Sequence, residues 1–163
     1  MFDKKPESQL YHKAFGQFSS SKTQKPATLQ PVEIELDTQE DTFGGEHYVD
    51  FKKGVVTIKN TGMYLIIAGP QIVKDSGTEA RWIDFWLRIN SIDVPNSNIR
   101  HSVKDPEIKD VAVLQVLTKL NKGDILSVMM SIQELNEGLG IECIEPEGEP
   151  VIPSIILTVI QLD

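Results

Sequence analysis

The sequence contains a single cysteine, Cys143. One cysteine excludes a framework of disulfides within the chain, so the fold must be held together by a hydrophobic core. Cys143 lies in the stretch Gly-Ile-Glu-Cys-Ile, where apolar neighbours favour a small, partly buried hydrophobic side chain. A reactive nucleophile is the alternative interpretation.

Long apolar runs are also missing. The longest, from Val151 to Ile160, is interrupted by Pro153, Ser154 and Thr158, and it is far shorter than the roughly 20 residues that span a bilayer. The first residues of the chain lack the apolar stretch of a secretory signal. We therefore expect no membrane insertion. The location stays open between the cytosol and a spore, cell or virion surface.

Basic residues are absent after Lys122. The chain has 16 basic and 24 acidic residues, for a net charge of −8, and the eight surplus acids all follow Lys122. Nucleic acids and anionic lipids are bound by clusters of lysine and arginine, so the charge balance argues against both partners.

Stretches long enough for a helix are scarce, because glycines and prolines divide the chain into short segments. The segment from Val32 to Leu36 alternates apolar and polar residues, and Trp82 to Ile89 is rich in aromatic and β-branched residues, as strands prefer. The segment from Val111 to Leu120 fits a short helix or a strand, and its strand-like neighbours favour a strand. About ten strands at intervals of roughly eight to twelve residues predict an all-β antiparallel sandwich or barrel.

The chain shows no internal repeat and no linker. Residues 1–13 are mostly polar and are predicted to form a flexible N-terminal arm, in which Leu10 and Tyr11 could dock on the body of the protein. Residues 14–163 are predicted to form a single domain of ordinary size.

Two of the predicted strands are apolar on both faces. In the strand that begins at Met63, Tyr64 and Ile66 point to one side while Leu65 and Ile67 point to the other. The strand from residue 155 to residue 162 has the same property. A two-layer sandwich buries only one face of each strand, so the second apolar face needs a further cover. Another subunit is the favoured cover, and the N-terminal arm is the alternative.

Several short motifs resemble the tumour-necrosis-factor-like jelly rolls, a superfamily that includes the globular head of complement C-one-q. The resemblance covers about residues 14–162, and its motifs occur in the family's order. The motifs are Asn60-Thr61-Gly62-Met63-Tyr64-Leu65-Ile66, the Gly-Asp turn at Leu117 to Leu126, the closing strand from Pro153 to Leu162, and, as in the microbial and viral branch, Ala14 to Gln24, Phe85 to Asn90 and Val94 to Asn98.

The resemblance implies a two-sheet jelly-roll sandwich that assembles as a homotrimer. In the family, outward residues of the Gly-x-Tyr strand and of the last strand build the trimer seam, and in this chain the matching positions are Leu65, Ile67 and Ile156. Two features depart from the pattern. The sequence has no collagen-like or membrane stalk, and Asn90-Ser91-Ile92 stands where an Asn-Gly turn is typical.

Motifs for catalysis are absent. His12, His47 and His101 are far apart and lack the spacing of zinc ligands, and the serines lack a Gly-x-Ser-x-Gly frame. No phosphate loop or dinucleotide fingerprint occurs. We therefore expect no enzymatic activity and no cofactor.

Two polar or aromatic features have a functional alternative. The four carboxylates of Glu142, Glu145, Glu147 and Glu149 are expected to form a solvated acidic loop, and a calcium site is the alternative. The aromatic residues Trp82, Phe85 and Trp86 are expected to pack in the core, and a sugar-binding platform is the alternative.

The sequence thus favours a non-enzymatic, trimeric jelly-roll module with a structural, surface or recognition role. Such a module would bind a protein or glycan through its loops, with avidity from three copies. The alternative function is a carbohydrate-binding or carbohydrate-processing β-sandwich.

Overall fold

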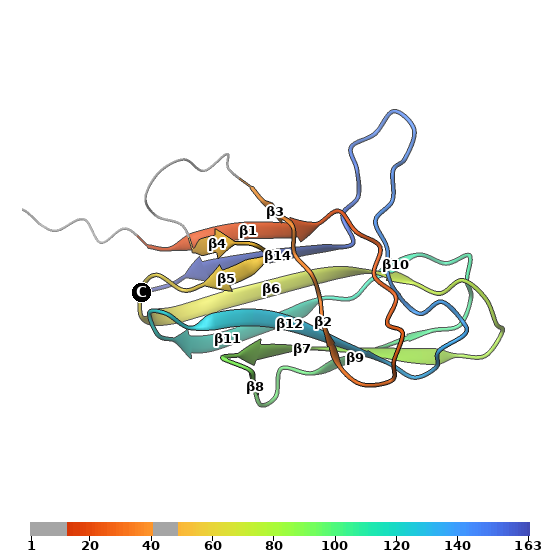
Figure 1. The fold of residues 1–163 in the computed structure, drawn as a ribbon, viewed down its shortest axis with the longest axis horizontal. Helices are drawn as coiled ribbons and strands as arrows, with labels where there is room; N and C mark the ends of the chain where they lie inside the picture. Colours follow the sequence, from red (N-terminus) through yellow and green to blue (C-terminus); the bar gives the residue numbers. More distant parts are fainter. Residues whose placement is uncertain (1–12, 41–48) are drawn as a thin grey trace, which may run out of the picture.

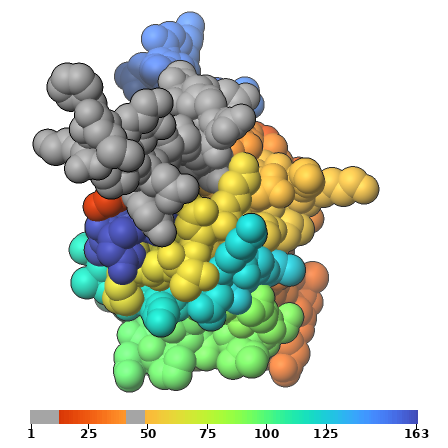
Figure 2. Space-filling view, turned by 90° about the vertical axis from the view of Figure 1, so that its left-hand side faces the viewer, coloured from red at the N-terminus to blue at the C-terminus, as the bar shows by residue number. Residues whose placement is uncertain are grey.

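A computed structural model describes residues 13–40 and 49–163 (Figure 1). Within these residues the chain is all-β, with fourteen strands in two antiparallel sheets of seven strands each. The predicted class, a two-sheet antiparallel jelly-roll sandwich, is confirmed. Figure 2 shows one end of the molecule, where the C-terminal residues (dark blue) and the residues near 90 (green) lie apart on the surface.

The first sheet is built around its longest strand. Its strands are β1 (Phe15–Ser20), β3 (Thr38–Gln39), β6 (Gly62–Val73), β10 (Asp110–Val111), β11 (Leu114–Leu120), β13 (Gly140–Ile141) and β14 (Ile155–Gln161). The order across the sheet is β10-β6-β14-β1-β3, and β11 and β13 also pair with β6.

The second sheet is built around β12 and β7. Its strands are β2 (Val32–Glu33), β4 (Asp50–Lys52), β5 (Val55–Thr57), β7 (Arg81–Ile89), β8 (Ile92–Asp93), β9 (Ile99–Val103) and β12 (Ile125–Ile132). The order is β4-β5-β12-β7-β8, with β2 on β12 and β9 on β7. The strands of seven or more residues, β6, β7, β11, β12 and β14, pass alternately between the two sheets, which is the jelly-roll connection pattern.

The expected number of about ten strands was too low, because five of the fourteen described strands are only two residues long. The segment from Val111 to Leu120 is a strand as predicted, but it is interrupted after Val111. Ala112 lies in the interruption and donates its backbone N–H to the carbonyl oxygen of Pro70 at 3.1 Å. The chain therefore continues along β6 through the break between β10 and β11.

The core lies between the two sheets and follows the alternation of the strands. In β6 it takes Tyr64 and Ile66, and in β7 it takes Ile83, Phe85 and Leu87, all fully buried. The predicted core position of Phe85 is confirmed. The buried hydroxyl of Tyr64 donates to the Asn60 carbonyl oxygen at 2.7 Å, so this large side chain leaves no unpaired polar group inside the sandwich.

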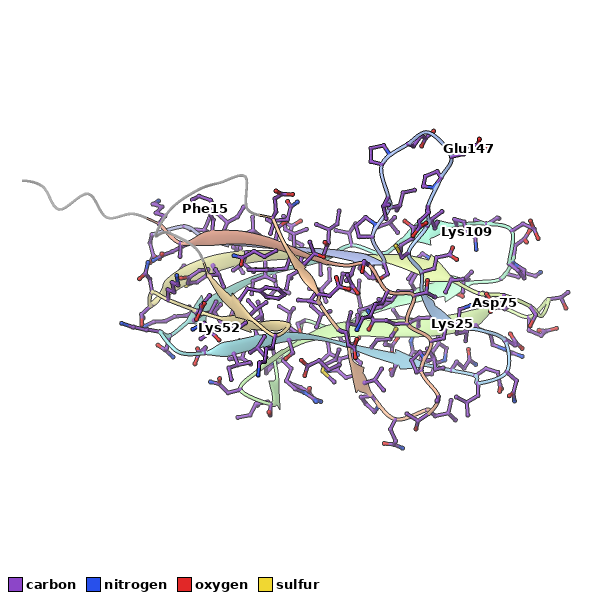
Figure 3. All side chains as sticks on the ribbon, turned by 45° about the horizontal axis from the view of Figure 1, so that its top comes forward. Phe15, Lys25, Lys52, Asp75, Lys109 and Glu147 are labelled. Carbon is purple, nitrogen blue, oxygen red and sulfur yellow. The ribbon has the colours of Figure 1, made fainter. Side chains whose placement is uncertain are left out.

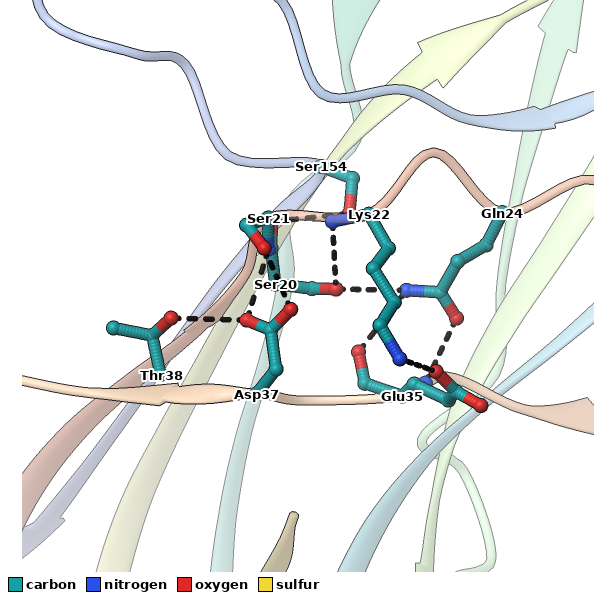
Figure 4. A network of polar contacts seen from close by, with 8 residues as sticks. All are labelled: Ser20, Ser21, Lys22, Gln24, Glu35, Asp37, Thr38 and Ser154. Carbon is teal, nitrogen blue, oxygen red and sulfur yellow. Dashed lines mark hydrogen bonds and ion pairs between the residues drawn. The ribbon is translucent and has the colours of Figure 1, made fainter.

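A polar network joins the residues that follow β1 to the segment between β2 and β3 (Figure 4). Ser21 donates from both its backbone N–H and its hydroxyl to the Asp37 carboxylate, at 3.0 and 2.7 Å. The Gln24 side chain makes two hydrogen bonds with the backbone of Glu35, one as donor and one as acceptor. Burial raises the pKa of Asp37, but the hydrogen bonds from Ser21 and Thr38 outweigh it and hold the pKa below its ordinary value. This network fastens the segment that crosses from β2 to β3.

Candidate assembly face

The outer face of the first sheet has three central strands that carry no charge. The three central strands β1, β14 and β6 contain six, seven and twelve residues, and none of these residues is Asp, Glu, Lys or Arg. Sheets that face water on one side normally carry polar and charged residues there. The absence of charge across three adjacent strands is therefore the first unusual feature of this face.

The strand register brings apolar side chains into a continuous row on this face. Phe15 of β1 lies opposite Ile160 of β14, Ile160 lies opposite Leu65 of β6, and Leu65 lies opposite Leu117 of β11. Directly opposite residues of paired strands point to the same side and contact one another. Four strands thus contribute one apolar row that crosses the sheet.

The three residues named from the sequence lie on this same face. Leu65 and Ile67 are half-buried, whereas Ile156 is 41% exposed. Ile156 lies opposite Gly69, and an added methyl group at Gly69 would be 3.6 Å from a methyl carbon of Val111. The apolar surface therefore extends from Ile156 across the glycine to β10.

Sequence reasoning missed several members of this surface. Leu117 is 62% exposed and Ile160 is 36% exposed, although both are large aliphatic residues. Leu117 could have been found from the alternation of β11, whose residues Leu114 and Leu120 face the core. The contribution of Phe15 depends on a pairing between opposite ends of the chain, which no local pattern reveals.

The outer face of the second sheet has the opposite character. The Arg100 guanidinium lies 4.1 Å above the ring of Trp82 and donates two hydrogen bonds of 2.8 Å to the Asp84 carboxylate. The indole N–H of Trp86 donates to Asp93 at 2.7 Å. These charges are satisfied within the chain, and the aromatic rings lie beneath polar partners.

The expectation of core packing was therefore wrong for Trp82, which is half-buried, whereas Trp86 is buried as expected. Both point outward with Asp84, because alternation along β7 sends the intervening residues, including Phe85, into the core. Trp86 is almost fully buried and Arg100 covers the ring of Trp82, so the two indoles do not form an open, flat platform for a sugar ring.

The acidic loop lies between β13 and β14 and projects beyond β1 (Figure 1). Glu147 lies at its far end, and Lys109 lies nearer the sandwich (Figure 3). Glu142 is at the base, where its carboxylate is 2.8 Å from the Lys109 ammonium, whereas Glu145, Glu147 and Glu149 are exposed. Among the described residues no three His, Cys, Asp or Glu side chains form a group that could hold a metal ion. The solvated loop stays the prediction, and a calcium site stays its untested alternative.

The remaining candidate residues are dispersed. His12, His47 and all of the predicted arm except Lys13 lie outside the described residues. His101 has its Nε2 atom 3.2 Å from a carboxylate oxygen of Asp110. Cys143 is half-buried; burial raises the pKa of its thiol, and the charge of Glu145 raises it further. A raised pKa lowers the thiolate fraction at neutral pH and disfavours a nucleophilic role.

The fold and this face define an all-β sandwich in which one sheet face is uncharged and apolar along its three central strands, while the other carries the Arg100–Asp84 and Arg88–Asp93 pairs. Within residues 13–40 and 49–163 there is no helix able to span a bilayer. The chain matches no model of a known protein family and no curated protein by sequence.

Proposed function

We propose that this protein is a non-enzymatic, homotrimeric jelly-roll module that serves in surface display or recognition and that assembles through the outer face of its first sheet. One observation carries the proposal. The central strands of that face are uncharged and present a row of apolar residues, while the other outer face pairs its charges internally.

The exposed apolar residues favour burial against another copy. Fully burying a large aliphatic side chain contributes about 1.5–3 kcal/mol. Ile156, Ile160 and Leu117 are 36–62% exposed, so they together retain about 2–4 kcal/mol of unused burial per subunit. Depletion of charge at the centre of a patch is also typical of permanent interfaces between subunits.

The three-fold symmetry of the proposal rests on the resemblance to the tumour-necrosis-factor-like and complement C-one-q heads. Their seam positions correspond to Leu65, Ile67 and Ile156, which lie on the apolar face described above. A rigid trimer would offer three identical sets of loops, so that weak binding at each site gains by avidity. Three copies would carry three times −8, or −24, a charge that favours solubility.

The test is the molar mass of the purified protein by size-exclusion chromatography with light scattering. The expected mass is three times 18.2 kDa, or 54.6 kDa, at micromolar concentration. A monomer at that concentration would contradict the assembly, and a stable dimer would contradict the three-fold symmetry. A panel of hydrolase substrates should show no turnover, and turnover that depends on one carboxylate would contradict the non-enzymatic role.

A further inference from the structure

The loop from β6 to β7 and the loop from β9 to β10 lie at the end of the sandwich farthest from the C-terminus (Figure 1). Residues of these loops and of the strand ends beside them line a cavity of about 620 Å³. The lining residues are Gly77, Thr78, Ser102, Val103, Lys104, Asp105, Pro106, Ile108 and Asp110. Its volume is in the range of sites that hold small ligands or a few side chains of a peptide.

A buried lysine ties the two walls of this cavity together. The ammonium of Lys74 has no exposed side-chain surface and donates to the carbonyl oxygens of Gly77, Glu79 and Lys104, at 2.9, 2.7 and 2.8 Å. Gly77 lines one wall, and Lys104 lines the other. One cation thus holds both loops in place before any ligand arrives, which lowers the entropic cost of binding.

A carboxylate holds the same ammonium from the other side. Glu137 lies 3.5 Å from the Lys74 nitrogen and accepts hydrogen bonds of 3.0 and 2.7 Å from Arg81. These hydrogen bonds outweigh burial and hold the pKa of Glu137 below its ordinary value. Glu137 therefore stays ionised at neutral pH, paired with Arg81 and next to the Lys74 nitrogen.

The lining combines an apolar surface with an excess of negative charge. Val103, Pro106 and Ile108 supply the apolar part, and Ile108 is largely exposed. Asp105 and Asp110 supply two carboxylates against the single cation of Lys104. A ligand that complements this surface has an apolar group next to a positive charge.

An edge strand runs into the cavity. Within the described part of the chain, β9 pairs only with β7, so its second edge is unpaired there. Ser102 and Val103 at the end of β9 line the cavity. An extended peptide can pair with such an edge through its backbone and place alternate side chains in a neighbouring pocket. The edge favours a peptide over a small free cation.

We propose that this cavity binds an extended peptide segment of a partner protein, with a lysine or arginine beside a large aliphatic residue. The aliphatic side chain packs on Val103, Pro106 and Ile108, and the cation faces Asp105 and Asp110. The proposal deepens the recognition role given above and rests on it, but it does not require the trimer.

The test uses an alternating leucine–lysine hexapeptide and its leucine–glutamate counterpart, titrated by calorimetry into the full-length protein. Binding of the basic peptide alone is expected. The double variant Asp105→Asn, Asp110→Asn should weaken it about tenfold, because two surface charge pairs are lost while the oxygens that cap the loop remain. Thr78→Trp should block the cavity and weaken binding further.

The matched control is Glu147→Gln, Glu149→Gln, which makes the same change of charge on the exposed acidic loop. Unchanged affinity in this control supports the cavity, whereas equal weakening in both double variants would show nonspecific attraction and overturn the proposal. If butylamine binds as tightly as the basic peptide when the two affinities are compared per positive charge, the assignment of a peptide ligand is overturned. Light scattering on the same samples separates the two proposals. A trimer that binds no peptide refutes only the peptide site, and a monomer that binds the peptide refutes only the proposed assembly.

Discussion

The substitution Ile156→Asp tests the assembly face directly. Ile156 is 41% exposed in the single chain and lies opposite Gly69, so an aspartate there can reach water in a monomer. In a trimer the same side chain is enclosed by another subunit, and three carboxylates are buried together. The substitution should therefore act on assembly far more than on folding.

The magnitude follows from two terms. Loss of the isoleucine contact costs about 1 kcal/mol per subunit, in proportion to its exposed fraction, and an unpaired buried carboxylate costs several kcal/mol. A conservative total of about 3 kcal/mol per subunit is about 9 kcal/mol per trimer. The trimer dissociation constant should then rise about a million-fold, and the variant should be monomeric at micromolar concentration.

The assay is light scattering over a dilution series, with urea unfolding of the same sample as a check on folding. Ile125→Asp is the matched control, because Ile125 has a similar exposure of 45% but lies on β12 of the second sheet. The control should keep the wild-type mass. An Ile156→Asp variant that is folded and has the wild-type mass would refute the proposed interface. If that variant does not fold, Leu117→Asp on the same face carries the test.

Three further predictions concern single ionisable groups. Lys74→Met should lower the free energy of unfolding in urea by about 3 kcal/mol or more, because three buried carbonyl oxygens lose their donor. The control Lys104→Met, at an exposed lysine, should change this free energy by less than about 0.5 kcal/mol. Equal effects of the two substitutions would contradict the structural role of Lys74. The pKa of Glu137 is lower in the folded protein than its ordinary value of 4.5, so the ionised carboxylate stabilises the fold above pH 4.5. This stabilisation is lost as the pH falls through the lowered pKa of the folded state. Between about pH 5 and pH 3 the wild type should therefore lose more stability than Glu137→Gln. Cys143 should react with a thiol reagent at pH 8 more slowly than a cysteine in a short peptide, and Glu145→Gln should speed the reaction; a faster wild-type rate would show that its pKa is not raised.

The outward positions of Leu65, Ile67 and Ile156 could be predicted because each lies in a strand that has apolar residues on both of its faces. The extent of the face could not. Phe15 joins the row only because β1 pairs with β14, a contact between residues about 145 positions apart, and register between distant strands leaves no local trace. Trp82 was misassigned because alternation identifies two faces without saying which is the core, and residue type alone favoured burial.

Lys74 shows the same limit at the proposed peptide site. In the sequence it is one of 16 basic residues, and it follows two buried residues of β6. Its role arises because three loop carbonyls from two connections meet around one ammonium, which only the closed sandwich brings about.

The sequence by itself determined the all-β class, the lack of disulfides, the acidic last quarter and the two strands that are apolar on both faces, because these depend on composition and on a repeat of two residues along the chain. Tertiary structure alone decided which apolar residues share one face, which tryptophans point outward and where a preformed cavity lies. Those features depend on strand register and on contacts between segments far apart in the chain.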